Sequence, residues 1–274
     1  MKSDKVLIAG PWVGEFGWEL FAWQAYVRSL SKYFSKTIVV SRPNSKSLYE
    51  DFADEFIAFN PPNALADSYF LHNVDTNMLF KQVVRDNKIS LDKNTTVLLP
   101  RRVGVPPHTH FDEFVSFGSY KIKPEYIKFG GDTEAKYDYL FHIRNRELRK
   151  QDNWSLDNWS KLKNLLGSDK IACIGTKKES SHIEGTYDLR DINLKNLLGY
   201  ISTSKCVFGP SSGPMHLSSL CNTPHVVWSY SGNKTRYTIN WNPLCTKVLF
   251  LDEYQWHPTP EYVYNSFKKW RNHE

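Results

Sequence analysis

Short apolar runs alternate with amphipathic stretches over most of the chain. Four such runs in the first part of the sequence are short and continuous, which is typical of buried strands in a parallel sheet. They lie at residues 5–10, 37–40, 55–59 and 95–99. Apolar positions at helical spacing predict helices between them, at residues 18–34, near 45–52 and at 76–87. Strands that alternate with helices predict an α/β fold.

The alternation stops once and then restarts. Between residues 101 and 131, Gly, Pro, His and aromatic residues follow one another without a period, which indicates an irregular, substrate-facing segment. Strands and helices alternate again over residues 137–252, and a closing amphipathic helix is expected at 259–271. We therefore predict two Rossmann-like domains that face a cleft, one at residues 1–130 and one at 131–258.

The composition is that of a folded globular chain. Of the 274 residues, 41% are hydrophobic and 23% are charged, which is ordinary for a protein with a buried core. Aromatic residues reach 15%, with nine Trp, so aromatic side chains are expected on sugar-facing surfaces as well as in the core. The net charge of +6 favours an anionic partner such as a nucleotide, a nucleic acid or an anionic lipid surface, without choosing among them.

The sequence carries no signal for export, membrane insertion or metal binding. The chain begins with polar residues and a strand pattern, and no apolar run approaches the roughly 20 residues of a membrane span. Four cysteines without metal-ligand spacing are typical of free thiols, three of them in or next to apolar runs: Cys173, Cys206, Cys221 and Cys245. We therefore expect a soluble, cytoplasmic protein without a metal site or a transmembrane segment.

A turn of small residues joins one apolar run to the next predicted helix. This stretch, residues 209–216, has the sequence Gly-Pro-Ser-Ser-Gly-Pro-Met-His. Ser212 or Gly213 can cap the helix, and Pro214 suits its first turn, where a missing N–H costs nothing. Backbone N–H groups at the positive end of a helix form a binding site for phosphate. We therefore place a diphosphate at Ser211, Ser212, Gly213, Pro214, Met215 and His216.

A second cationic stretch follows the apolar run at residues 137–141. His142, Arg144 and Arg146 alternate along it, so they face the same side of a strand end. Because arginine forms paired hydrogen bonds with phosphate oxygens, we expect these residues to bind the diphosphate; the alternative is an exposed basic turn. His216 likewise has two interpretations, a phosphate donor or a packed structural histidine. Weaker candidates for donor binding are Lys177, Lys234 and Arg236.

These stretches resemble the donor-site motif of heptosyltransferase-like glycosyltransferases of family nine, which have the GT-B fold. The resemblance rests on the turn up to His216, on Thr223-Pro224 before the next apolar run, and on the Trp-containing helix start at residues 153–162. It covers the C-terminal half of the chain. It implies that a nucleotide-sugar binds the C-terminal domain, and that a C-terminal helix at residues 259–274 crosses back to the first domain.

The resemblance also implies a mechanism. The family carries a Gly-acid pair after its first strand, and that acid deprotonates the acceptor; Gly14-Glu15 matches the pair, whereas Glu19 better fits the distance to the helix end. A carboxylate at a helix start can act as a base or only stabilise the helix dipole. The absence of an Asp-x-Asp pair favours a metal-independent transfer, and the resemblance implies an inverting one. The family usually has Asp where this chain has Ser211 or Ser212, which leaves the donor sugar open.

We interpret the sequence as a metal-independent glycosyltransferase without a cofactor that moves a sugar to a hydroxyl of a saccharide or glycolipid. Two alternatives stay open. A basic, aromatic-rich chain could glycosylate hydroxymethylated bases in DNA, which would make its binding salt-dependent. A non-catalytic nucleotide- or sugar-binding module would bind a nucleoside diphosphate without turnover. A hydride-transfer enzyme is not supported, because the sequence contains no G-x-G-x-x-G.

Overall fold

The chain divides into two compact units, residues 1–126 and 127–274. The computed structural model describes residues 3–60, 75–100, 115–117, 120–131 and 133–272. Most of the segment predicted to be irregular and substrate-facing, residues 101–114 and 118–119, therefore lies outside the described residues.

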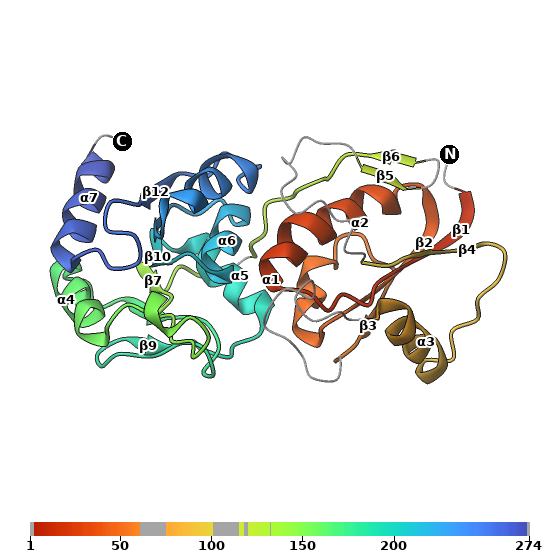
Figure 1. Ribbon diagram of the computed structural model, residues 1–274, viewed down its shortest axis with the longest axis horizontal. Helices are drawn as coiled ribbons and strands as arrows, with labels where there is room; N and C mark the ends of the chain where they lie inside the picture. The colour runs from red at the N-terminus through yellow and green to blue at the C-terminus, as the bar shows by residue number, and fades with distance from the viewer. Residues whose placement is uncertain (1–2, 61–74, 101–114, 118–119, 132, 273–274) are drawn as a thin grey trace. The chain divides into compact units, whose positions relative to one another are not determined.

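Unit 1 is built on a four-stranded parallel sheet in the order β3-β2-β1-β4 (Figure 1). The predicted runs form these strands, with bounds β1 (Ser3–Ala9), β2 (Phe34–Ser41), β3 (Glu55–Ala58) and β4 (Thr95–Leu98). The central strand β1 is covered on both faces, since Leu7, Ile8 and Ala9 are all buried. Burial on both faces explains why the run is continuously apolar rather than alternating.

The first helical region of unit 1 differs in detail from the single helix predicted at residues 18–34. It consists of α1 (Phe16–Trp18), a π-helical turn (Glu19–Trp23) and α2 (Gln24–Ser31), after which β2 begins at Phe34. The next predicted helix is a 3₁₀ helix (Pro43–Leu48), and α3 (Thr76–Asp86) follows with Asp75 as its N-cap. A short antiparallel hairpin, β5 (Val115–Phe117) and β6 (Tyr120–Ile122), completes the described elements.

Unit 2 is built on a six-stranded, entirely parallel sheet in the order β12-β11-β10-β7-β8-β9. When the strands of unit 2 are numbered 1 to 6 from β7 to β12, the order from the β9 edge is 3-2-1-4-5-6, which is the Rossmann strand order. The strands are β7 (Tyr139–Phe141), β8 (Ile171–Cys173), β9 (Tyr187–Asp188), β10 (Cys206–Pro210), β11 (His225–Trp228) and β12 (Val248–Leu251). The prediction of two α/β units with parallel sheets is thus confirmed.

Two of the four α-helices described in unit 2 begin at residues whose side chains cap them. The four helices are α4 (Leu156–Leu166), α5 (Leu194–Thr203), α6 (Gly213–Leu220) and α7 (Pro260–Asn272). Ser155 and Asn193 accept backbone N–H groups at the starts of α4 and α5, and Gly167 ends α4 in the left-handed region with φ 62°. In the described part of the chain, no helix combines the length and the hydropathy needed to cross a bilayer.

Aromatic side chains fill the core of unit 2. The rings of Trp154, Trp159 and Trp228 lie within 5.2 Å of one another, centroid to centroid. On the other side of the cluster, Phe267 of α7 packs against Phe208. The resemblance predicts that the C-terminal helix crosses back to the first domain; within unit 2, α7 lies beside α4 and contributes to the core of that unit (Figure 1). Phe267 explains this placement, because its burial requires the apolar face of α7 to pack on this sheet.

Candidate functional site

The candidate site lies at the point in unit 2 where the strand order reverses. From β7 the chain moves outward to β8 and β9, and then returns to the opposite side of β7 to form β10. In open parallel sheets, ligands bind outside the carboxyl ends of the strands at this switch point. His142 follows β7, and Ser211 and Ser212 follow β10, so the topology brings two segments that the sequence singled out to one place.

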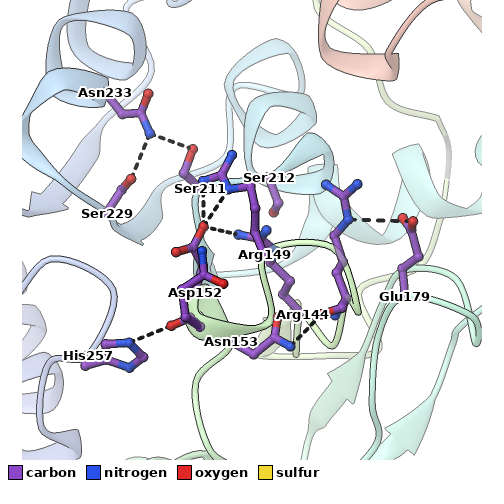
Figure 2. Close-up of polar contacts among 12 residues, drawn as sticks. Arg144, Arg149, Asp152, Asn153, Glu179, Ser211, Ser212, Ser229, Asn233 and His257 are labelled. Atoms are coloured by element: carbon purple, nitrogen blue, oxygen red, sulfur yellow. Dashed lines mark hydrogen bonds and ion pairs between the residues drawn. The ribbon is translucent and has the colours of Figure 1, made fainter. Parts of the chain in front are cut away.

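The turn at residues 211–214, here called the serine turn, is half-exposed and held from below by hydrogen bonds. The Ser211 N–H donates to the Trp228 carbonyl, at 3.1 Å, which continues the ladder between β10 and β11. The Tyr237 hydroxyl accepts the Ser212 N–H at 3.0 Å and donates to Ser211 Oγ at 3.1 Å. Asn233 Nδ2 lies 3.5 Å from Ser211 Oγ and also donates to Ser229 Oγ (Figure 2).

Fewer backbone N–H groups are open in the serine turn than the sequence suggested. Ser212 is the N-cap of α6, but its side chain makes no capping hydrogen bond, and its own N–H is occupied by Tyr237. Pro214 has no N–H. Within the described part of the chain, the N–H groups of Gly213 and Met215 have no acceptor, and they lie at the positive end of the α6 dipole. Only Gly213 is half-exposed, because Met215 is fully buried. This end of the helix can therefore bind an anion through the Gly213 amide and the helix dipole.

His142 links the two strand ends across the switch point. Its Nδ1 forms a 2.8 Å hydrogen bond with Ser212 Oγ. Glycines near the ends of the flanking strands let them approach His142 closely: a Cβ would lie 3.2 Å from His142 Cβ at Gly209, inside β10, and 3.0 Å from His142 Cδ2 at Gly175, after β8. Burial, with a smaller contribution from Arg144 and Arg146, lowers the His142 pKa to about 3. His142 is therefore a neutral imidazole that orients the Ser212 hydroxyl.

The two predicted arginines, Arg144 and Arg146, follow His142 at the switch point, but they differ in exposure. The Arg144 side chain is 3% exposed, its guanidinium lies 5.4 Å from the Trp256 ring centroid, and its Nε has no hydrogen-bond partner in the described residues. Arg146 is more accessible and lies 3.6 Å from a Glu179 oxygen. Arg144 therefore supplies a fixed positive charge from beneath the surface, whereas Arg146 can reach a ligand.

A third arginine, Arg149, belongs to the same group and was not predicted. Its Nε donates to Asp152 Oδ2 at 2.8 Å, its Nη2 forms an ion pair with the same oxygen at 2.6 Å, and its guanidinium lies 5.5 Å from the Trp256 ring centroid. Arg144, Arg146 and Arg149 are called the arginine cluster below. Local spacing could not identify Arg149 as a member of this group, because its position depends on Trp256. Trp256 follows the edge strand β12, whereas Arg149 follows the interior strand β7.

His216 lies in a packed aromatic layer beneath the serine turn. Its ring stacks on Tyr237 with a centroid distance of 4.2 Å and an interplanar angle of 11°, and it meets Trp241 edge-on at 4.7 Å. Burial, with a smaller contribution from Arg236, lowers its pKa well below the usual value. Met215 is buried with it. These two members of the motif shape the turn from inside, and the half-exposed members are Ser211, Ser212, Gly213 and Pro214.

The weaker candidates lie around the rim of unit 2. Lys177 is exposed after β8, and Lys234 is 3.3 Å from an Asp252 oxygen. Arg236 is half-buried over the Trp241 ring, at 4.9 Å, and lies 3.4 Å from Asn233 Oδ1. Since Asn233 contacts Ser211, Arg236 is the one of these three that is connected to the serine turn.

The two candidate bases of unit 1 have opposite environments. Glu19 is completely buried, and its carboxylate accepts hydrogen bonds from the hydroxyls of Ser41, Ser45 and Tyr49. Glu15 is half-exposed and precedes α1, where its carbonyl accepts the Glu19 N–H at 3.1 Å. A carboxylate enclosed by three hydroxyl donors is not accessible to an acceptor sugar, so Glu15 is the one that can serve as a base.

No protein-family model matches the chain, and no curated protein matches it. Solved structures do match. They include E. coli ADP-heptose lipopolysaccharide heptosyltransferase II, with 12% identity, a TM-score of 0.59 and coverage of 98% of this chain and 100% of that chain. E. coli heptosyltransferase WaaC with ADP has 11% identity, a TM-score of 0.58 and coverage of 98% and 99%. The fold is heptosyltransferase-like.

A further structure with this fold is the family 9 glycosyl transferase from Veillonella parvula. It has 10% identity and a TM-score of 0.55, with coverage of 92% of this chain and 87% of that chain. The resemblance seen in the sequence is thus confirmed at the level of a heptosyltransferase-like GT-B fold, and it extends over both units rather than the C-terminal half alone.

Among the described residues, no group of three or more His, Cys, Asp or Glu side chains is placed to bind a metal ion. The charged groups gathered at the switch point of this heptosyltransferase-like fold are arginines instead.

Proposed function

We propose that the protein is a glycosyltransferase whose nucleotide-sugar donor binds unit 2, with its diphosphate between the serine turn and the arginine cluster. The observation that carries the proposal is the arrangement at the switch point: the start of α6, with the open Gly213 amide, lies after β10, and three arginines follow the adjacent strand β7. Helix N-termini and guanidinium groups both bind phosphate oxygens. The fold similarity to heptosyltransferases supports the same assignment.

The proposed chemistry is a direct displacement at the anomeric carbon. The acceptor oxygen forms a bond to that carbon while the bond to the diphosphate oxygen breaks, and the diphosphate leaves with the electron pair. Negative charge therefore develops on the leaving group, where the α6 dipole and the arginine cluster stabilise it. We propose that these groups make a metal ion unnecessary, and that the configuration is inverted in the single displacement.

Glu15 is the proposed general base. It would accept the proton of the acceptor hydroxyl as the new bond forms, and general base catalysis of this kind contributes about 10²–10⁴-fold to a rate. Glu19 is assigned a structural role in the proposal, because its carboxylate is enclosed in unit 1. The proposed acceptor is a hydroxyl of a saccharide or glycolipid, and no described feature of either unit favours DNA.

The proposal is tested first by binding. Thermal shift and calorimetry with ADP, UDP, GDP and CDP should identify one nucleoside diphosphate that stabilises the protein. Arg146→Ala should weaken that binding about tenfold, since a charge-assisted hydrogen bond to phosphate is lost. Lys161→Ala is the matched control, because Lys161 is an exposed cation of the same unit that pairs with Asp157 on α4. If no nucleoside diphosphate binds, the proposal fails.

Turnover distinguishes the proposal from its alternatives. With the matching nucleotide-sugar, the enzyme should release the nucleoside diphosphate and transfer the sugar to a saccharide acceptor. A non-catalytic module would bind the nucleotide and never release it from the sugar. A DNA-modifying enzyme would instead lose duplex binding steeply between low and moderate salt, because phosphate contacts release counterions.

A further inference from the structure

We propose that Arg149 is a diphosphate-binding residue and that Asp152 is the positioning residue that holds it in place. The inference rests on the proposed function of the switch-point site, and it assigns two residues that sequence analysis did not single out. Asp152 is a carboxylate in an otherwise cationic group, so a role in anion binding is not obvious from its charge. Its geometry gives the reason for its presence.

Asp152 contacts two members of the arginine cluster, Arg144 and Arg149. Its side chain is 8% exposed. Oδ2 accepts a 2.8 Å hydrogen bond from Nε of Arg149, forms an ion pair with Nη2 of Arg149 at 2.6 Å, and lies 3.7 Å from Nη1 of Arg144 (Figure 2). One oxygen thus contacts two nitrogens on the same edge of the Arg149 guanidinium, which restricts the position of the group.

Trp256 provides a second restraint on the same guanidinium groups. The centroid of its ring is 5.4 Å from the Arg144 guanidinium and 5.5 Å from that of Arg149. The loop that carries Trp256 is tied to the 3₁₀ turn (Lys150–Asp152), because His257 Nε2 forms a 2.8 Å hydrogen bond with the Gln151 carbonyl (Figure 2). Arg149 is therefore held between a carboxylate and an aromatic ring that belong to two different loops.

The backbone also indicates that Arg149 is placed for a purpose. Its φ of 59° and ψ of 48° lie in the left-handed region, which is unfavourable for a residue with a Cβ. Such conformations persist where surrounding contacts impose them, and they are common at binding sites. Here the Asp152 N–H donates to the Arg149 carbonyl at 3.0 Å, which closes the turn and directs the side chain back onto Asp152.

The remaining donors of Arg149 can reach a ligand. Its side chain is 53% exposed even though two of its nitrogens contact Asp152, so Nη1 and the outer N–H of Nη2 remain for phosphate oxygens. The group as a whole stays positive, since the two carboxylates Asp152 and Glu179 face the three arginines of the cluster. Arg149 is thus an exposed guanidinium with a fixed orientation beside two more arginines.

The proposal and simple electrostatics predict opposite effects of replacing Asp152 on the affinity for a nucleoside diphosphate. If Asp152 were only a negative charge near an anion site, Asp152→Asn would strengthen nucleoside diphosphate binding. As a positioning residue, its replacement by Asn releases Arg149 and should weaken that binding about tenfold. Asp152→Glu retains the carboxylate and should restore part of the affinity. Asp157→Asn on α4 is the matched control: the same charge change, in the same unit, at an exposed carboxylate should leave the affinity unchanged.

The decisive experiment is a double-mutant cycle measured by calorimetry, with the nucleoside diphosphate among ADP, UDP, GDP and CDP that binds the unmodified protein. Arg149→Gln alone should weaken binding about tenfold, and Asp152→Asn should add little in the Arg149→Gln background, because the two residues act as one unit. Additive losses, or equal or tighter binding by Asp152→Asn, would overturn the role of Asp152.

The outcomes separate this inference from the proposed function. If the unmodified protein binds none of the four nucleotides, the proposed function fails and this inference falls with it. If it binds one, and Arg146→Ala weakens binding while Arg149→Gln does not, only the present inference is overturned. Arg149 is half-exposed and its replacement is not expected to unfold the protein, so this variant gives an answer even if Asp152→Asn fails to fold.

Discussion

The buried carboxylates of Glu19 in unit 1 and Asp152 in unit 2 show how similar groups take different roles. Glu19 is fully enclosed and accepts hydrogen bonds from neutral groups, the hydroxyls of two serines and a tyrosine, while the cation of Arg42 lies 3.9 Å away. Asp152 is bound by arginines, one of which extends into solvent. A buried carboxylate whose donors are themselves buried can only stabilise the fold, whereas one whose partner is exposed can orient that partner toward a ligand.

Buried histidines also distinguish the two units, and they give the largest predicted effect: a decrease in the free energy of unfolding at acidic pH. Unit 2 buries His142 and His225, and burial lowers the pKa of each, to about 3 and about 4. In the unfolded chain, both histidines are protonated below about pH 6.5, whereas in the folded chain they stay neutral to a lower pH. The free energy of unfolding is therefore highest above pH 6.5 and falls as the pH drops toward 4, by about 3 kcal/mol for each histidine.

This acid sensitivity should be larger in unit 2 than in the described part of unit 1, because those residues of unit 1 contain no histidine. Hydrogen exchange followed by mass spectrometry, between pH 7 and pH 4.5, can measure the opening of each unit separately after correction for the intrinsic rate. His225→Gln should reduce the pH dependence of unit 2. A pH dependence that is equal in the two units, or unaltered by His225→Gln, would contradict the assignment.

Replacing Glu19 tests the structural side of the comparison. Glu19→Ala leaves the hydroxyls of Ser41, Ser45 and Tyr49 without their acceptor and opens a cavity, so we expect a loss of about 3–5 kcal/mol in the free energy of unfolding. Urea denaturation measures this loss. Glu55→Ala is the control, because its ion pair with Lys36 is exposed and should contribute less than about 1 kcal/mol. Similar losses in both variants would show that the Glu19 network is not stabilising.

Replacing Glu15 tests the functional side. Glu15→Gln retains size and polarity but cannot accept a proton, so the turnover rate should fall about 10²–10⁴-fold. Affinity for the nucleoside diphosphate should not change, because that ligand is assigned to unit 2. Rates from steady-state assays and dissociation constants from calorimetry separate the two quantities. An unaltered turnover rate would remove Glu15 as the base.

The extent to which sequence predicted the site differs between the two sides of the switch point. The contact between His142 and Ser212 follows from a pattern, because each residue comes directly after an apolar run and parallel strands end at one edge of a sheet. The Asp152–Arg149–Trp256 arrangement follows from no pattern. It requires the loop after β12 to meet the turn after β7, and only the packed sheet order brings those loops together.

The fold shows the same division. Continuous apolar runs such as those in β1 and β10 were predicted from the sequence, because strand segments buried on both faces have few polar residues. The two-residue strand β9 is exposed and has no such signal. The π-helical turn (Glu19–Trp23) was missed because helical spacing does not distinguish it from an α-helix. The amide of Ser212 was expected to be open, and only the position of Tyr237 shows that it is not.

Two buried tyrosines, Tyr237 and Tyr49, give the smallest but most closely matched test. Tyr237→Phe removes the acceptor of the Ser212 N–H and a donor to Ser211, at a cost of about 1 kcal/mol in stability, because water can reach the half-exposed turn. Tyr49→Phe removes a 2.8 Å hydrogen bond to the sealed Glu19 carboxylate and should cost more, about 2 kcal/mol.

Nucleoside diphosphate affinity should respond in the reverse order. Tyr237→Phe frees the serine turn from its support and should weaken binding several-fold, since a preorganised turn loses less entropy when the ligand binds. Tyr49→Phe should leave the affinity unchanged, because Tyr49 belongs to the structural network of unit 1. Urea denaturation and calorimetry on the same two variants measure both quantities. If the variant that loses more stability also loses more affinity, the separation between a structural unit 1 network and a ligand-binding unit 2 network is wrong.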